Sequence, residues 1–230
     1  SGYRFEEPKD KKDQLISLEV NADLGFAELV SATGKSKYKS VGQRDQTDLL
    51  VRLDYGYEQF PAFAAFTRED EEADILTQEI RLVSPDEDDL SWIVGAYYNR
   101  SKTSDRSQEF VPGFSQFTLD VWQTGGALRT DDLEYLSVGE ERITEKALFG
   151  EVMYKVNDAL TMTLGARHYK YDVWSRSAID LPLLYTSILG SRSDGDIVLD
   201  HKEVSADDSG TLFKFNASYD VSDDMMTYLT

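Results

Sequence analysis

The chain has 230 residues, a formal net charge of −19 and no cysteine. The lack of cysteine excludes disulfides and thiolate metal sites, and the acidic balance argues against nucleic-acid binding, which needs concentrated lysine and arginine. With 13 Tyr and 11 Phe against 4 Met, the composition favours strands. No apolar run reaches the roughly 18 residues of a membrane-spanning helix, and no Pro/Gly/Ser-rich linker divides the chain, so we treat it as one unit.

Eight segments alternate between apolar and polar residues, as strands with two different faces do. In chain order they are residues 14–22, 26–38, 76–84, 90–101, 144–156, 160–172, 210–221 and 225–230. The alternation is strictest near the C-terminus, where every second residue is apolar: Phe213, Phe215, Ala217, Tyr219 and Val221. The pattern predicts an all-β protein.

The connections between these segments alternate in length. Short ones lie at 23–25, 85–89, 157–159 and 222–224, whereas the long ones contain about 37, 42 and 37 residues. Tight periplasmic turns and long extracellular loops are typical of an antiparallel transmembrane β-barrel. A soluble sandwich has more uniform, shorter turns. We therefore expect a barrel segment of about eight strands.

Charged side chains in these strands are expected to face the barrel lumen, because a Lys or Arg facing mid-bilayer lipid costs about 2–4 kcal/mol. The alternation predicts this for Glu79, Arg81, Glu151, Lys155, Arg167 and Lys214. Pairing with one another across adjacent strands is the simpler role for them, and lining the lumen or contacting a plug is the other. Aromatic residues expected near the strand ends, as in interfacial girdles, are Trp92, Tyr98, Tyr154 and Tyr219.

Two stretches carry a family resemblance. Residues 76–85 read LTQEIRLVSP and residues 90–98 read LSWIVGAYY. Together they resemble a hairpin common in TonB-dependent receptors of proteobacteria. The hairpins within 147–167 and 215–228 are similar to the same family, and the resemblance covers about half of the chain.

The resemblance implies a barrel of about 22 strands in the outer membrane of a Gram-negative bacterium, in contact with lipid and lipopolysaccharide. It also implies an N-terminal plug inside the barrel and opening by energy transmitted through TonB. No plug, TonB box or terminal strand with an aromatic end is visible in the chain. Eight strands cannot close so wide a barrel, and open edges are not viable in lipid. We therefore expect residues 1–230 to be part of the barrel domain, with the plug absent from this chain.

The function that the resemblance implies is active import of a scarce nutrient, a ferric siderophore or similar iron chelate above all. Aromatic residues in the expected outer loops are candidate ligand contacts, with packing among the loops as the simpler role. These candidates are Tyr55, Tyr57, Phe60, Phe114 and Trp122. Haem, cobalamin and glycans stay open as ligands, since loops carry no general code.

Metal and cofactor sites are not predicted. The acidic runs 68–74 and 86–89 are interpreted as solvated, the first in an outer loop and the second in a periplasmic turn. Residues 193–196 (SDGD) only partly match a calcium loop, whose further ligands are missing. His168 and His201 have no partner at metal-ligand spacing.

The sequence contains no glycine-rich phosphate loop, no Gly-x-Ser-x-Gly elbow and no His-Glu-x-x-His pair, so we do not expect an enzyme. Two alternatives to the receptor remain. One is a passive porin-type channel, which a plug domain upstream would argue against. The other is a soluble all-β binding or adhesion module, which would bury the apolar face of 213–221 under a second sheet.

Overall fold

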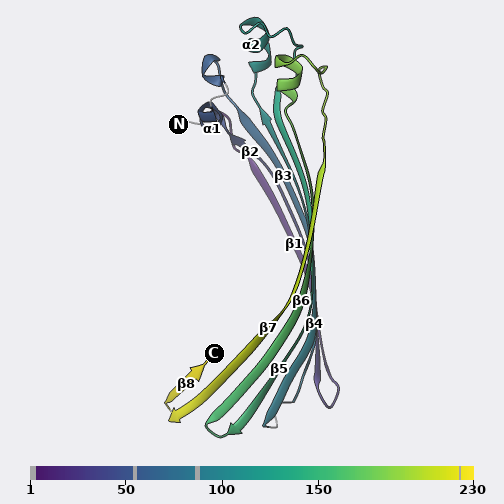
Figure 1. Cartoon of the computed structure of the whole chain (residues 1–230), viewed down its shortest axis with the longest axis vertical. Coiled ribbons are helices and arrows are strands. Elements are labelled where there is room, and N and C mark those ends of the chain that lie inside the picture. The colour runs from purple at the N-terminus through teal and green to yellow at the C-terminus, as the bar shows by residue number, and fades with distance from the viewer. Residues whose placement is uncertain (1–3, 54–55, 86–88, 223) are drawn as a thin grey trace.

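The computed structural model describes the chain except residues 1–3, 54–55, 86–88 and 223. The described residues form one antiparallel sheet in which eight strands pair in sequence order. The strands are β1 (Lys9–Asp23), β2 (Glu28–Asp45), β3 (Phe66–Val83), β4 (Leu90–Phe110), β5 (Leu133–Asn157), β6 (Leu160–Asp180), β7 (Lys202–Ser222) and β8 (Met225–Leu229). Figure 1 shows them side by side as one long, curved sheet. Among the described residues, no helix is long and apolar enough to cross a membrane.

Short turns join the strands at one end of the sheet and long connections join them at the other (Figure 1). At the first turn, Asp23 accepts a 2.7 Å hydrogen bond from the N–H of Gly25, whose φ of +83° favours glycine. Asn157 accepts bonds of 3.0 and 2.9 Å from the N–H groups of Ala159 and Leu160. Both are the local side-chain caps that Asp and Asn supply in tight turns. The short connections at 85–89 and 222–224 lie partly outside the described residues.

All eight predicted strands are present, but several extend farther toward the loop end than the alternation predicts. The long connections comprise only residues 46–65, 111–132 and 181–201. Loops near 40 residues were therefore the wrong prediction. At the loop end the strands carry polar residues on both faces, so apolar and polar residues no longer alternate along the sequence there.

The acidic run 68–74 lies in β3 and not in an outer loop, which corrects the prediction. Cations of β2 face it: Lys39 Nζ lies 2.5 Å from Glu72 Oε1, and Arg44 Nη2 lies 2.8 Å from Glu69 Oε1. Opposite charges on neighbouring strands favour pairing of those strands. Exposed ion pairs of this kind contribute little to stability, so backbone pairing on both sides does most to keep the run in the sheet. Of the run 86–89, only the last residue is described.

The register gathers apolar side chains on one face of the sheet from β1 to β7, in what is called the apolar band below. Its members include Leu18, Val20, Ile80, Leu82, Val94, Leu148, Val152, Leu164, Phe213 and Phe215. The described residues place no second layer over it, and the side chain of Phe213 is 83 % exposed. The opposite face at the same height carries charged residues among apolar ones and is called the charged face.

Ser31, Thr33 and Gln78 interrupt the apolar band on β2 and β3, and they satisfy one another. The Gln78 side chain accepts a hydrogen bond from the Thr33 hydroxyl and donates a 3.1 Å bond to Ser31 Oγ. In lipid, an unsatisfied polar group costs several kcal/mol, whereas a paired group does not carry that penalty. The trio is thus compatible with a lipid-facing position.

Candidate functional site

The long connections pack into one body at the loop end of the sheet, called the loop cluster (residues 46–65, 111–132 and 181–201; Figure 1). It contains the short helices α1 (Thr47–Leu50), η1 (Val51–Leu53), η2 (Tyr57–Gln59), α2 (Phe114–Asp120) and η3 (Leu184–Ile188). Its buried core consists of Leu50, Tyr57, Phe63, Ala65, Val111, Phe114 and Leu183. Because all three connections contribute to this core, each depends on the other two for burial.

Aromatic rings hold the centre of the loop cluster together. Tyr57 stacks on Phe63 with ring centroids 4.8 Å apart, and it meets Phe114 edge-on at 5.0 Å. Trp122 packs edge-on against Phe114 at 5.4 Å. Such pairs add about 0.5–1.5 kcal/mol each beyond the area they bury. The glycine that precedes η2, Gly56, has φ +85° and lies under the Trp122 ring, so a side chain at this position would displace the ring.

The predicted ligand contacts lie within or against this core. Tyr57 and Phe114 are each 2 % exposed, whereas Phe60 and Trp122 are half-buried. Tyr55 lies outside the described residues. In this arrangement the side chains of Tyr57 and Phe114 contact other loop residues and have no open surface to offer. Ligand contact through these aromatic residues stays a prediction.

A carboxyl group lies beneath the aromatic core. Glu134, at the loop end of β5, accepts a 2.8 Å hydrogen bond from the Tyr57 hydroxyl. Burial raises the pKa of Glu134 above its usual value, the Tyr57 hydrogen bond opposes this, and the nearby carboxylate of Glu109 raises it further. Burial also raises the pKa of Glu109, against the opposing charge of Arg44. We therefore expect the packing of this part of the loop cluster to respond to pH.

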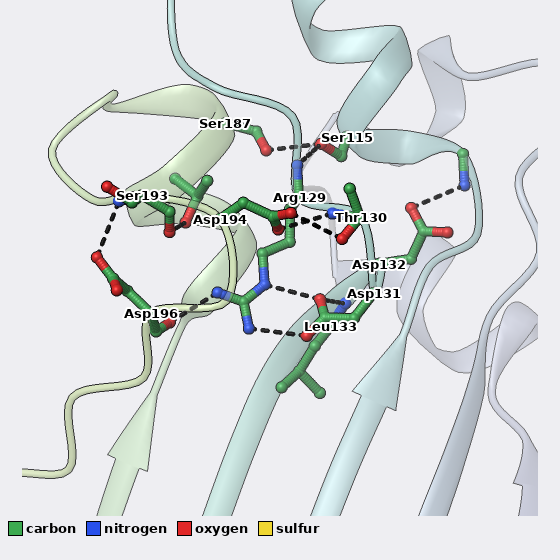
Figure 2. A network of polar contacts seen from close by, with 12 residues as sticks. Ser115, Arg129, Thr130, Asp131, Asp132, Leu133, Ser187, Ser193, Asp194 and Asp196 are labelled. Carbon is green, nitrogen blue, oxygen red and sulfur yellow. Dashed lines mark hydrogen bonds and ion pairs between the residues drawn. The ribbon is translucent and has the colours of Figure 1, made fainter.

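A buried arginine ties two of the connections together, as Figure 2 shows. The Arg129 side chain is fully buried, and its Nε and Nη2 donate to the two carboxylate oxygens of Asp131 at 2.7 and 2.9 Å. Its Nη1 donates to the backbone carbonyl of Asp196 at 2.6 Å. This forked, charge-assisted arrangement is among the stronger hydrogen-bond geometries in proteins. Arg129 thereby links the 111–132 connection to the 181–201 connection.

The calcium-like stretch at 193–196 takes part in the same network (Figure 2). Asp194 accepts hydrogen bonds from the N–H and hydroxyl of Thr130 at 2.9 and 2.7 Å, and these bonds hold the pKa of Asp194 below its usual value. Asp196 accepts a 2.9 Å bond from the N–H of Ser193. Both carboxylates therefore bind loop groups, and the described residues contain no cluster of three metal-ligating side chains.

The six charged residues predicted to face the lumen all lie on the charged face. The pairing of neighbouring strands places most of them close to another of the six. Lys214 Nζ lies 2.8 Å from Glu151 Oε2, and Arg81 Nη1 lies 3.2 Å from Glu79 Oε1. Lys155 lies near the turn end of the same face.

Arg167, the remaining one of the six charged residues, pairs with a residue that was not among those six. Arg167 Nη2 lies 2.6 Å from Glu145 Oε1, and its guanidinium lies 5.2 Å from the centre of the Tyr97 ring. The alternation contained the signal for Glu145, since it shares the face of Glu151 on β5. Arg129 and Glu134 gave no such signal, because Arg129 binds the Asp196 carbonyl and Glu134 binds the Tyr57 hydroxyl, each in a different connection.

Neither histidine has a metal-binding partner among the described residues. His168 Nδ1 lies 3.0 Å from Thr211 Oγ1, its neighbour across β6 and β7. His201 is exposed, one residue before β7 begins.

An eight-stranded antiparallel sheet with one exposed apolar band, one charged face and all long loops at one end is the wall of an outer-membrane β-barrel. The family described as TonB dependent receptor-like, beta-barrel, matches residues 2–230. The chain belongs to this family, whose members are outer-membrane proteins of Gram-negative bacteria. None of the curated proteins compared with the chain matches it in sequence.

Solved structures with the same fold include three receptors. The ferric yersiniabactin uptake receptor FyuA from Yersinia pestis superposes with a TM-score of 0.70 at 12 % identity, over 99 % of this chain and 29 % of its own. The siderophore receptor PiuA from Acinetobacter baumannii gives 0.62 at 11 %, over 98 % and 32 %. The ferric-catecholate import receptor Fiu from E. coli K12, in its open form, gives 0.55 at 14 %, over 96 % and 35 %. The chain thus spans about a third of the length of these receptors.

Proposed function

We propose that these residues form part of the barrel wall of a receptor that imports a ferric siderophore or similar iron chelate, energised through TonB. The observation that carries the proposal is the family match over residues 2–230, on a sheet whose strand order and faces suit a barrel wall. The iron-chelate ligand is supported by the fold shared with FyuA, PiuA and Fiu, which are a ferric yersiniabactin uptake receptor, a siderophore receptor and a ferric-catecholate import receptor. Further strands close the barrel, to about 22 in all, and a plug domain that is not in this chain fills it.

In this proposal the apolar band contacts lipid and the charged face lines the lumen. The ion pairs of Lys214 with Glu151 and of Arg167 with Glu145 support this, since paired charges suit a wet lumen and not a lipid surface. The charged face also presents charged groups to the lumen, where a plug surface of complementary charge would lie. The loop cluster then faces the outside and forms part of the rim over which a ligand enters.

The ligand contacts in this proposal are the half-buried aromatic residues Phe60 and Trp122, on the surface of the loop cluster. The buried Tyr57 and Phe114 support them from within and gain access to a ligand only if the loop cluster opens. Tyr55 is retained as a further candidate. Aromatic surfaces of this kind bind flat or apolar parts of chelates through stacking.

Deletion of the gene tests the proposal in the organism that carries it. Under iron limitation, uptake of radiolabelled iron is measured with a ferric catecholate, a ferric hydroxamate and ferric citrate as probes. We expect uptake of at least one complex to fall strongly in the deletion strain and in a TonB-deficient strain alike. Uptake that needs this gene but not TonB would favour the porin-type channel. Unchanged uptake of all three complexes would overturn the iron-chelate ligand.

Fractionation of the same cells tests the location separately. We expect the protein in the outer-membrane fraction, soluble only in detergent, and a reading frame that encodes a plug domain upstream. A protein that is soluble without detergent would favour the all-β binding module instead, and would overturn the receptor proposal.

A further inference from the structure

The chain has one Asp-Gly pair, Asp194 with Gly195 in the loop cluster, and it has no Asn-Gly pair. In an Asp-Gly pair the backbone nitrogen of the glycine can attack the aspartate side chain, because glycine has no Cβ to shield that nitrogen or to restrict its backbone. Both residues are exposed, and nothing lies within 4 Å of a Cβ added at Gly195. Water therefore reaches this pair, and the surroundings leave space for a ring to form.

The reaction of such a pair rearranges the chain without oxidation or reduction. The nitrogen of Gly195 forms a bond to Cγ of the protonated Asp194 carboxyl group, the C–OH bond breaks, and the hydroxyl leaves with the amide proton as water. The product is a five-membered succinimide ring, and water then adds to one of its two carbonyl carbons. Opening at Cγ restores aspartate. Opening at the backbone carbonyl carbon gives isoaspartate, whose main chain runs through Cβ and is one carbon longer.

The structure holds the Asp194 carboxyl group in its unreactive, charged form. Its two oxygens accept hydrogen bonds from the N–H and the hydroxyl of Thr130, at 2.9 and 2.7 Å (Figure 2). Hydrogen bonds to a carboxylate favour the charged form, and this form has no hydroxyl to lose to an attacking nitrogen. Thr130 contributes most to the low pKa of Asp194, and the N–H of Gly195 contributes to it as well. The attacking nitrogen therefore already lies beside the carboxyl group.

The turn that contains the pair also carries a bond between two long connections. The N–H of Asp196 donates to the Ser193 carbonyl at 3.3 Å, and the Asp196 side chain accepts from the Ser193 N–H at 2.9 Å. The Asp196 carbonyl accepts from Arg129 at 2.6 Å. An additional main-chain carbon at position 194 would change the spacing on which these bonds depend. Isoaspartate also carries its carboxylate directly on Cα, which shortens its reach toward Thr130.

We propose that Asp194 and Gly195 are a site of spontaneous isoaspartate formation, and that Thr130 suppresses the reaction while the connections 111–132 and 181–201 stay joined. Rearrangement then follows opening of the loop cluster. It also makes the opening permanent, because the longer turn does not fit back onto Thr130 and Arg129. The proposal depends neither on a ligand nor on transport, since it uses only contacts within the loop cluster.

The experiment uses the complete protein, purified in a neutral detergent and incubated at near-neutral pH in water enriched in oxygen-18. Each passage through the ring adds one labelled oxygen at residue 194, which peptide mass spectrometry measures, and chromatography separates the isoaspartate peptide. Thr130→Val removes the hydroxyl donor and keeps the shape of the side chain. We expect labelling about two- to tenfold faster in Thr130→Val than in the wild type, since one hydrogen bond contributes about that factor. Labelling of the wild type unfolded in urea is expected to be faster still.

Thr124→Val is the matched control. Thr124 Oγ1 bonds the Ser187 carbonyl at 2.6 Å, so it joins the same two connections without contact to Asp194. We expect this control to label at the wild-type rate, and Asp194→Glu to give the background, because its longer side chain does not form the five-membered ring. Equal labelling of the folded and the unfolded wild type would overturn the proposal without need of a variant. An equal increase in both threonine variants would overturn the protective role of Thr130.

Discussion

The hydroxyl of Tyr57, in the first long connection, donates a 2.8 Å hydrogen bond to Glu134 at the loop end of β5. This contact joins the aromatic core of the loop cluster to a carboxyl group whose pKa is raised by burial. A group with a raised folded-state pKa stabilises the fold most below its unfolded pKa, and the contribution is lost as pH rises through the folded pKa. Glu134 therefore couples the order of the loop cluster to pH.

We expect hydrogen exchange in residues 46–65 and 111–132 to slow as pH is lowered from 8 toward 5, after correction for the intrinsic exchange rate. Glu134→Gln keeps an acceptor for Tyr57 but has no charge to bury, so its exchange is expected to be slower than wild type at pH 8 and to depend less on pH. Tyr57→Phe is the control, because it removes the hydrogen bond and keeps the charge. Identical pH profiles for wild type and Glu134→Gln would show that Glu134 does not control the loops.

Removal of the Arg129 fork is expected to loosen two connections at once. Arg129→Met removes the guanidinium donors of Asp131, which still accepts from the Leu133 N–H, and of the Asp196 carbonyl, and loss of one partner of a buried pair costs about 3–5 kcal/mol. Because Asp131 is partly exposed, the lower part of this range is expected. Limited proteolysis should cut both 111–132 and 181–201 faster, while Arg52→Met, at an exposed position, should leave the pattern unchanged. Faster cutting in only one connection would contradict the linking role.

The Phe149 ring lies opposite Gly95 on the charged face and leaves no room for a side chain at position 95. An added Cβ would lie 2.4 Å from Phe149 Cζ and 2.9 Å from the carbonyl oxygen of Ile80. Gly95→Val is therefore expected to destabilise the barrel by about 1–3 kcal/mol, as overpacking does. Gly34→Val is the control, because nothing lies within 4 Å of its added Cβ. Folding into lipid vesicles, followed in urea, measures both, and equal stabilities would refute the predicted clash.

Two neighbouring residues of β5 test which face contacts lipid. Val152 lies in the apolar band and Met153 on the charged face, and their exposures within this sheet are similar, 46 % and 39 %. Val152→Arg is expected to cost about 2–4 kcal/mol of folding free energy in vesicles, whereas Met153→Arg should cost far less. A larger cost for Met153→Arg than for Val152→Arg would mean that the charged face contacts lipid, and it would refute the assignment of the lumen.

Much of the sheet was predictable from the sequence, because a strand with one apolar and one polar face leaves a period-two pattern. The run 213–221 and the charged residues Arg167 and Lys214 follow that pattern, and the register places them as the alternation predicts. The loop-end halves of the strands were not predictable in this way. In 68–74 both faces are acidic or polar, and the stretch is a strand because of partners on β2 and β4.

The candidate loop site was less predictable still. The aromatic residues at 57, 60, 114 and 122 lie in the long connections, but composition does not reveal whether a ring points outward or packs inward. The contacts of Arg129 with Asp196 and of Glu134 with Tyr57 join residues 67 and 77 positions apart, and no local pattern reports contacts of that separation. Ligand contacts on loops require the tertiary arrangement before they are assigned.

The shared core of the loop cluster has a consequence for how such a receptor changes its specificity. Loops that pack separately tolerate insertions and substitutions one at a time. Here a longer or shorter connection at 111–132 would have to refit Phe63 from the connection before it and Leu183 from the connection after it. New ligand preferences are thus expected to arise on the outer surface of the cluster, through residues such as Trp122, while the three connections keep their lengths together.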